Sequence, residues 1–278
     1  MKRMTLAISL FISNAIFAME AYVPKANNPE LEEISKPQSL LKVSSPVIEK
    51  KLIQINETSI FYTHSQTGFQ QEGSGQGYDT ENGVGKGIFV SYERSLVTNN
   101  ALNFNFWINQ ATFAEPNDIG GKDIEVRRAL ISGLYSWKWF KEDLGWHFDI
   151  GATALSQDPN SFTSNEKLVP HYLALGPTVA GGVEYQFGQT WKLKSSFALS
   201  MPAMFKEYGA NSGYHSLSWH YLGSLFIEKK LNKSLSFTFG LMLEGEEHRF
   251  DGEGERGVQD AVVSYSSIAV PVGVNYAF

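Results

Sequence analysis

The stretch "SLSFTFGLMLE" at residues 234–244 decides how the rest of the chain is interpreted, because its side chains alternate strictly in character. The odd positions are all large and apolar: Leu235, Phe237, Phe239, Leu241 and Leu243. Between them lie Ser236, Thr238, Gly240 and Met242. Successive side chains of a β-strand point to opposite faces, whereas a helix repeats every 3.6 residues. The stretch therefore predicts a strand with one apolar face and one mostly polar or small face.

The same alternation recurs throughout the region from residue 52 to the end of the chain. Ten segments carry it: 52–64, 84–96, 101–113, 126–140, 144–156, 171–186, 190–203, 215–229, 234–246 and 262–278. The segment at 52–64 is the least regular, because Glu57 and Ser59 interrupt the side that we interpret as its apolar face. The region predicts an all-β structure of about ten strands.

The connections between these segments alternate in length along the chain. The long ones are 65–83, 114–125, 157–170, 204–214 and 247–261, and the short ones are 97–100, 141–143, 187–189 and 230–233. The short ones contain typical turn residues such as Asn, Asp, Gly and Ser. This alternation predicts successive hairpins, with all the tight turns at one end of the sheet and all the long loops at the other.

The composition limits the class of protein. Of 278 residues, 42% are hydrophobic, 13% aromatic and 19% charged, which is too apolar and aromatic for a disordered chain. The net charge is −6 and no Lys/Arg-rich run occurs, so a nucleic-acid partner is not expected. There is no cysteine, which excludes disulfides and thiolate metal sites.

Every predicted strand has one apolar face. Such a sheet can cross a membrane only when it closes and leaves no edge, because lipid offers no hydrogen bonds to the backbone. We therefore expect a closed antiparallel up-and-down transmembrane β-barrel of ten strands. Eight or twelve strands, and a secreted soluble barrel, are the alternatives. Aromatic residues gather beside the short turns, as in an interfacial girdle: Tyr135, Trp137, Trp139, Phe140, Trp146, Tyr185, Phe187 and Trp191.

The end of the chain, "VPVGVNYAF" at residues 270–278, resembles the C-terminal signature of Gram-negative outer-membrane β-barrels. Phe278 is the terminal aromatic, Tyr276 stands two residues before it, and valines continue the alternation. The resemblance implies that the last strand is recognised by the barrel assembly machinery, with Tyr276 and Phe278 as the assembly signal. It also implies that the N- and C-termini are periplasmic, which requires an even number of strands.

The first residues predict export. Residues 1–18 have a basic start and a short apolar run, typical of a signal peptide, and the run is shorter than a membrane-spanning helix requires. Residues 19–51 contain four prolines and no sustained period, and we expect an extended periplasmic segment. The predicted organisation is a signal peptide at 1–18, this segment at 19–51 and the barrel at 52–278.

The polar face of the predicted strands carries charges of both signs on neighbouring strands. Buried charges must be paired, so we expect a salt-bridge network that plugs the lumen, with a selective pore as the alternative. The predicted network comprises Glu93, Arg128, Lys138, His147, Asp149, Glu184, Lys192, Lys194, His220, Glu228 and Glu244.

No catalytic residue is predicted. Long acidic loops on ten strands resemble those of omptin proteases, and five residues of suitable type occur, namely Asp118, Asp123, His215, His248 and Asp251. None has the tight spacing of that family. His215–Ser216 and His220 likewise lack the serine-histidine motifs of outer-membrane lipases. We interpret these histidines as hydrogen-bonding groups of loops or lumen.

The last loop is rich in carboxylates. Asp251, Glu253 and Glu255 alternate with glycine and form a weak candidate cation site. They do not complete a calcium-loop pattern, so no firm metal or cofactor is predicted. The expected cations there are Ca²⁺ or the divalent ions associated with lipopolysaccharide.

Taken together, these patterns predict a structural or interaction barrel with a plugged or narrow lumen: an anchor, receptor or adhesin-like protein acting through its extracellular loops. A porin-like small-solute channel is the alternative, and an omptin-like or lipase-like hydrolase is the third hypothesis. The expected partners are outer-membrane lipid and lipopolysaccharide, the barrel assembly machinery during biogenesis, and a periplasmic or surface protein.

Overall fold

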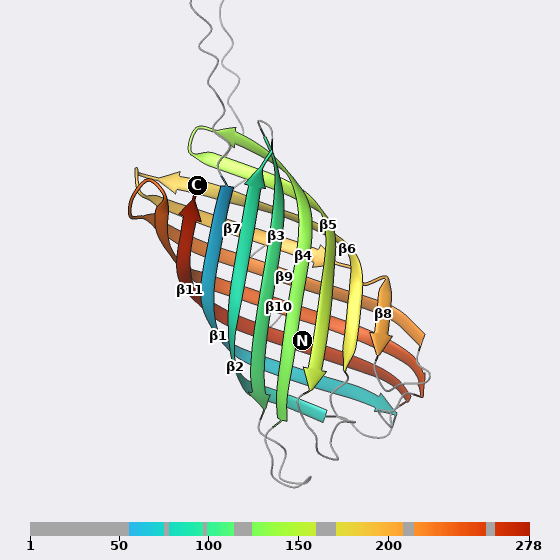
Figure 1. Ribbon diagram of the computed structural model, residues 1–278. Helices are drawn as coiled ribbons and strands as arrows, with labels where there is room; N and C mark the ends of the chain where they lie inside the picture. Colours follow the sequence, from blue (N-terminus) through green and yellow to red (C-terminus); the bar gives the residue numbers. More distant parts are fainter. Residues whose placement is uncertain are drawn as a thin grey trace, which may run out of the picture. The chain divides into compact units, whose positions relative to one another are not determined.

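A computed structural model of the chain describes residues 56–74, 78–96, 99–113, 124–159, 171–207, 214–253 and 259–278. The predicted signal peptide and the segment at 19–51 lie outside these residues. Within the described residues the regular structure is entirely β, and no helix is long and apolar enough to cross a membrane. The strands are β1 Asn56–Ser74, β2 Tyr78–Ser95, β3 Asn100–Phe113, β4 Ile124–Lys141, β5 Leu144–Pro159, β6 Tyr172–Phe187, β7 Trp191–Ser200, β8 Met204–Glu207, β9 Tyr214–Lys230, β10 Leu235–Glu253 and β11 Gln259–Ala277 (Figure 1).

The sheet closes on itself. Each strand pairs antiparallel with its neighbours in the order β5-β4-β3-β2-β1-β11-β10-β9-β7-β6, and β5 also pairs with β6. The short β8 pairs with β6 beyond the end of β7, so β7 and β8 are two parts of one wall strand. The eleven segments thus form a closed ten-stranded antiparallel barrel, which confirms the predicted fold and the fold expected from the resemblance to outer-membrane barrels.

Tight turns gather at one end of this barrel. Leu96 N–H donates to Asn100 O over 2.9 Å, and Gly188 has the positive φ of 70° that a glycine adopts at no steric cost. The side chain of Asn232 accepts bonds from two backbone amides of the turn between β9 and β10. Asn56 and Phe278 pair through both backbone bonds at the same end. We call this the short-turn end and the opposite one the loop end.

Two of the predicted long loops are wrong. The expected loop 65–83 is mostly strand, because β1 continues to Ser74 and β2 begins at Tyr78. The expected loop 247–261 is likewise strand up to Glu253 and from Gln259 onward. Both faces carry polar side chains in these parts of the sequence, so the hydrophobic alternation fades although the backbone ladder continues.

The predicted orientation of the first strand is also wrong. Ile60 is 52% exposed on the outside, whereas Phe61 is 4% exposed in the lumen, so the odd positions of β1 face inward. Ile60 lies opposite Val90 and Val274, which places it on the outer face of both neighbours. Glu57 and Ser59 therefore lie on the lumen face, and the apolar outer face of the strand is not interrupted by them.

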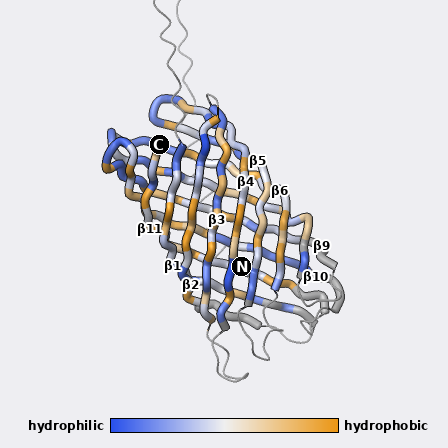
Figure 2. Tube along the Cα trace, viewed as in Figure 1, coloured by the Kyte–Doolittle hydropathy of each residue, from blue (hydrophilic) through white to orange (hydrophobic). Residues whose placement is uncertain are grey.

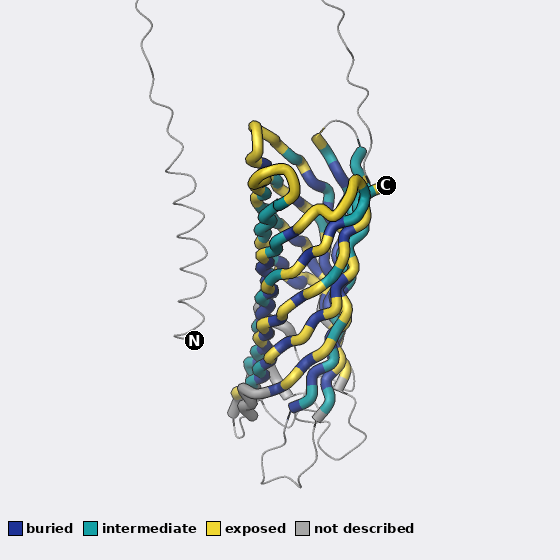
Figure 3. The backbone as a smooth tube through the Cα atoms, turned by 90° about the vertical axis from the view of Figure 1, so that its left-hand side faces the viewer, coloured by how far each residue is buried: buried dark blue, intermediate teal, exposed yellow. Residues whose placement is uncertain are grey.

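The outer face of the barrel is apolar. Large hydrophobic side chains are exposed on nearly every strand, and exposed and buried residues alternate along the chain (Figures 2 and 3). On β10 the outward side chains include Phe237, Phe239 and Leu241, as the opening stretch predicts, while Met242 points inward. A closed sheet with such an exterior satisfies its backbone internally and can lie in lipid.

The predicted aromatic girdle is present beside the short turns. Trp137, Trp139, Phe140, Trp146 and Tyr185 are all exposed there. Rings of the girdle contact one another in two groups, one on β4 and β5 and one on β6 and β7. Aromatic rings with a polar edge favour the boundary between hydrocarbon and water.

The lumen holds an apolar cluster in addition to polar groups. Its members come from strands all around the barrel: Phe61, Phe89, Trp107, Leu130, Leu155, Tyr172, Ala174, Met242 and Ala269. The predicted interior was polar, and this apolar cluster was not predicted. A narrow barrel fills its lumen with side chains, so inward positions can be apolar wherever they pack against one another.

Candidate functional site

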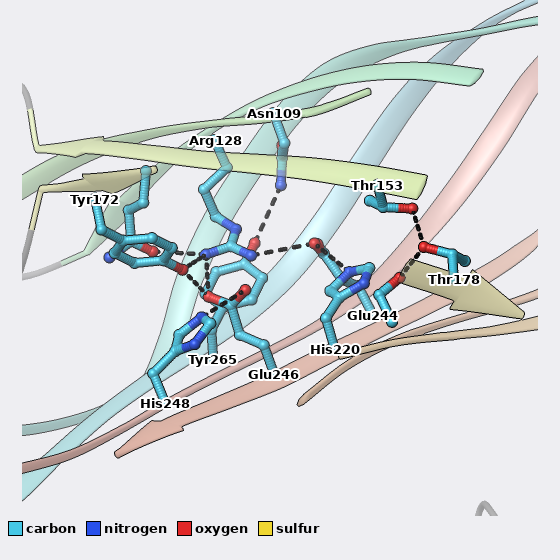
Figure 4. A network of polar contacts seen from close by, with 12 residues as sticks. Asn109, Arg128, Thr153, Tyr172, Thr178, His220, Glu244, Glu246, His248 and Tyr265 are labelled. Atoms are coloured by element: carbon cyan, nitrogen blue, oxygen red, sulfur yellow. Dashed lines mark hydrogen bonds and ion pairs between the residues drawn. The ribbon is translucent and has the colours of Figure 1, made fainter. Parts of the chain in front are cut away.

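The lumen is bridged by Arg128, which extends from β4 and is only 5% exposed. Its Nη2 lies 3.1 Å from Glu244 Oε1 and its Nη1 lies 2.6 Å from Glu246 Oε1. Both glutamates belong to β10, which stands opposite β4 in the barrel: β3, β2, β1 and β11 separate them on one side, and β5, β6, β7 and β9 on the other. The guanidinium therefore ties opposite walls together (Figure 4).

Three further side chains hold this guanidinium in place. Arg128 Nη1 donates to Gln157 Oε1 over 2.6 Å and to Tyr172 Oη over 3.2 Å. The Tyr172 hydroxyl in turn donates to Glu246, and the guanidinium carbon lies 3.5 Å from the centre of the Tyr265 ring. A planar cation that is bonded at its edge and stacked on its face has little freedom to move.

Two histidines complete the arrangement, which we call the Arg128 layer. His220 Nε2 is 3.3 Å from Glu244 Oε1, and His248 Nε2 is 3.4 Å from Glu246 Oε2. One guanidinium faces two carboxylates, and the imidazoles add polar contacts for the second negative charge: His220 hydrogen-bonds Glu244, and His248 lies within ion-pair distance of Glu246. A buried carboxylate without such partners would be costly.

Arg128, His220 and Glu244 were predicted on the lumen face, whereas Glu246 and His248 were not. Glu246 was the last residue of a predicted strand, and His248 fell in the predicted loop 247–261, where it was interpreted as a hydrogen-bonding group of a loop or the lumen. Its place in a loop is wrong, because β10 continues and His248 is buried. The polar residues at 244, 246 and 248 continue the alternation, and this pattern could have predicted that the strand extends with all three side chains facing the lumen.

A second charged layer lies toward the short-turn end. Lys194 of β7 is 2.8 Å from Glu228 Oε2 on the adjacent β9 and 3.4 Å from Glu57 Oε2 on β1 across the lumen. Asn275 donates to the same two carboxylates. This layer also crosses the barrel, and Glu57 is a member that the sequence analysis missed because it assigned the residue to the wrong face.

The remaining predicted lumen charges form local pairs. Lys192 is 3.4 Å from Glu184, Lys138 pairs with Glu93, and His147 Nδ1 is 2.9 Å from Asp149. Asp149 was expected beside lysines, and its partner among the described contacts is instead its neighbour on the same strand face. All eleven residues predicted for the lumen network thus have a polar contact inside the barrel.

Replacing Lys194 with methionine is expected to lower the free energy of unfolding by about 1 kcal/mol. The change leaves Glu57 and Glu228 without their shared cation. Glu228 is buried, but the Lys194 and Glu57 side chains are 29% and 31% exposed, so water screens part of the charge. Urea unfolding of the refolded barrel measures the effect. Lys230→Met, at the exposed end of β9, is the matched control and should change the free energy of unfolding little.

A cavity of about 480 Å³ is lined in part by the second layer and reaches inward to the Arg128 layer. It opens among the short turns, near Leu96 and Asn99, and extends inward to His220. At the Arg128 layer a hollow of about 10 Å³ is bordered by Trp107, Asn109 and Arg128 among others. That volume holds one water at most. Among the described residues, the lumen is thus a vestibule closed at the Arg128 layer.

Ser218, His248 and Glu246 have the order of groups found in serine hydrolases. Ser218 Oγ is 2.5 Å from His248 Nδ1, and the other ring nitrogen faces Glu246. A nucleophile must meet its substrate, yet Ser218 is 5% exposed and His248 fully buried, and neither lines the cavity. Arg128 and Tyr172 also engage the glutamate. The three side chains are therefore part of the hydrogen-bonded surroundings of Arg128.

The structure does not describe the side chains of several residues that the sequence singled out. Asp118, Asp123 and Glu255 lie outside the described residues, and His215, Asp251 and Glu253 belong to β9 and β10 in parts whose side chains are not described. The candidate cation site at Asp251, Glu253 and Glu255 therefore remains a prediction. Tyr276 and Phe278 lie on the outer face at the short-turn end, and their rings stack with centroids 5.8 Å apart.

An apolar exterior, an aromatic girdle and complete closure of the sheet decide the class of fold. The chain is a transmembrane β-barrel. No protein-family model matches the chain. No curated protein matches it either.

Solved structures of outer-membrane barrels show a distant likeness. OprG from Pseudomonas aeruginosa is 9% identical, with 81% of this chain and 96% of that one covered and a TM-score of 0.41. The protease OmpT from Escherichia coli is 9% identical, with 81% of this chain and 97% of that one covered and a TM-score of 0.41. The attachment invasion locus protein Ail from Yersinia pestis is 12% identical, with 81% of this chain and 99% of that one covered and a TM-score of 0.32. At this level the likeness assigns no function to the chain.

Proposed function

We propose that the protein is an integral outer-membrane barrel with a closed lumen, and that it acts as a structural or interaction protein through the connections at its loop end. The observation that carries this proposal is the Arg128 layer, which joins opposite walls and leaves a hollow of about 10 Å³. A solute cannot pass such a layer unless buried ion pairs break. The surfaces at the two ends of the barrel then remain as the places for function.

The proposed orientation places the short-turn end in the periplasm and the loop end outside the cell. Outer-membrane barrels have short periplasmic turns and longer extracellular loops, and here both barrel termini lie with the short turns. Residues 1–18 would direct export and 19–51 would lie in the periplasm. The proposed partners are outer-membrane lipid and lipopolysaccharide around the barrel, the assembly machinery during biogenesis, and a surface or periplasmic protein.

The purified wild-type barrel in a planar lipid bilayer is expected to pass no steady unitary current. The triple variant Arg128→Ala, Glu244→Ala, Glu246→Ala should conduct, because it removes the side chains that join the walls while the backbone barrel remains closed. Single-channel recording measures both, after a gel-shift assay has shown that each protein is folded.

Arg127→Ala is the matched control, since Arg127 is the exposed neighbour of Arg128 on the outer face of β4. It should remain silent like the wild type. Steady wild-type currents would overturn the closed-lumen proposal. A folded triple variant that stays silent would show that the Arg128 layer is not what blocks conduction.

A small-solute channel is the second candidate, and the vestibule of about 480 Å³ is the observation in its favour. A solute could enter as far as His220 and would then need the Arg128 layer to open. We propose no enzymatic activity, because the serine, histidine and glutamate of suitable order are buried away from the cavity.

A further inference from the structure

One wall of the vestibule is aromatic. Phe61 of β1, Phe89 of β2 and Phe226 of β9 all line it. The ring centre of Phe61 lies 5.7 Å from that of Phe89 and 5.1 Å from that of Phe226, so the three rings form one surface. Leu222 and Met242 also line the cavity. Such a surface favours a flat apolar face of a ligand.

The wall formed by β3 to β7 carries hydroxyl and amide groups. Asn105 donates to Ser132 over 3.1 Å, Thr178 bonds Thr153 over 2.7 Å, and Thr178 and Ser200 lie 2.8 Å apart. All five side chains line the cavity. Each hydroxyl has one donor and two acceptor positions, so these pairs keep bonding capacity for a further polar group.

The inner end of the cavity holds a buried nitrogen that lacks a partner. His220 is 2% exposed, its Nε2 faces Glu244, and its Nδ1 has no hydrogen-bond partner among the described residues. Figure 4 shows the ring between Glu244 and the Thr153–Thr178 pair. A carboxylate only accepts, so Nε2 donates to Glu244 and Nδ1 is the ring nitrogen left without a partner at the cavity. A ligand hydroxyl can both donate and accept, so it can bond a buried nitrogen of this kind.

The charged side chains at the mouth of the cavity already form ion pairs with one another. Lys138, Lys192 and Lys194 each form an ion pair with a glutamate, and His147 pairs with Asp149. A charged ligand would have to break one of these pairs before it gained an ionic contact. The entrance therefore favours a neutral ligand.

We infer that the vestibule binds a neutral polyhydroxylated ring molecule, of the size of a mono- or disaccharide, that enters from the short-turn end. A sugar ring has an apolar face for the phenylalanine wall and hydroxyls at its edge for the threonines, serines and Asn105. The volume of about 480 Å³ lies within the range of small-molecule sites. This inference goes beyond the proposed function and does not depend on whether the Arg128 layer conducts.

The test is a calorimetric titration of the folded full-length barrel in a detergent without a sugar headgroup. The probes are glucose and maltose, with gluconate and glucosamine as anionic and cationic counterparts. Saturable binding of a neutral sugar is expected, with both charged probes weaker. Thr178→Val should weaken binding about tenfold, because it removes a hydroxyl and leaves the shape of the side chain.

Thr67→Val is the matched control, since Thr67 is a buried lumen threonine that does not line the cavity. Phe61→Leu, which keeps an apolar side chain but removes the ring, is a second variant and should also weaken binding. The absence of saturable binding for both neutral sugars would overturn the inference. So would equal binding of the charged probes, or affinities that Thr178→Val and Phe61→Leu leave unchanged.

Discussion

Replacing Arg128 with methionine is expected to lower the free energy of unfolding by about 3–5 kcal/mol. The substitution keeps an apolar stem of similar length but removes the cation that faces Glu244 and Glu246. Two carboxylates then remain buried beside each other with only imidazoles and the Tyr172 hydroxyl as partners. Unfolding in urea, followed by tryptophan fluorescence in lipid vesicles, measures the loss.

Arg127→Met is the matched control for this prediction. Arg127 is the adjacent residue on the same strand but is exposed on the outer face. Its replacement should change the free energy of unfolding by no more than about 0.5 kcal/mol. Equal losses in the two variants would show that the Arg128 layer does not hold the walls together.

A triple variant separates the charge from the packing. Arg128→Met, Glu244→Gln, Glu246→Gln removes all three formal charges while it preserves side-chain size. A large part of the lost stability should return, because a buried ion pair often contributes little more than the neutral groups that replace it. If the triple variant is as unstable as Arg128→Met, the loss comes from packing around the guanidinium and not from unpaired carboxylates.

The architecture could be predicted from the sequence because a barrel in lipid shows its pattern on the outside. Side chains that face lipid are large and apolar, and they occupy every second position, as the alternation from Leu235 to Leu243 shows. The alternation is lost where the outward positions are polar. Beyond Tyr62 in β1 and Leu243 in β10 the outward positions are no longer large and apolar, so the strands continue without a hydrophobic signal.

The partners across the lumen could not be predicted in the same way. Alternation tells which face Arg128 occupies, but its contact with β10 depends on the number of strands, their tilt and their register together. Glu57 shows a further limit: an error of one position in the first strand moved it from the lumen to the lipid side. The inward phenylalanines have no sequence signal of their own, because an apolar residue fits either face of a narrow barrel.

Deleting Phe278 is expected to reduce the amount of barrel assembled in the outer membrane by about tenfold while export continues. The residue has two roles in the structure. Its backbone closes β11 on β1, since Asn56 N–H donates to Phe278 O and Phe278 N–H to Asn56 O, each over 2.9 Å. Its ring is 58% exposed on the outer face and stacks on Tyr276. Loss of one lipid-facing aromatic side chain costs about 1.5–3 kcal/mol, which is tenfold or more in an equilibrium.

Phe278→Asp and Phe278→Tyr divide these two roles. The aspartate keeps the backbone pairing with Asn56 but places a charge where the apolar ring lies, and we expect it to assemble as poorly as the deletion. The tyrosine keeps the ring and should assemble like the wild type. Heat-modifiable migration of membrane and periplasmic fractions measures folded and unassembled protein separately. If the aspartate variant assembled normally while the deletion failed, the backbone closure at Asn56 would be the essential contribution, and the terminal ring would not act as an assembly signal.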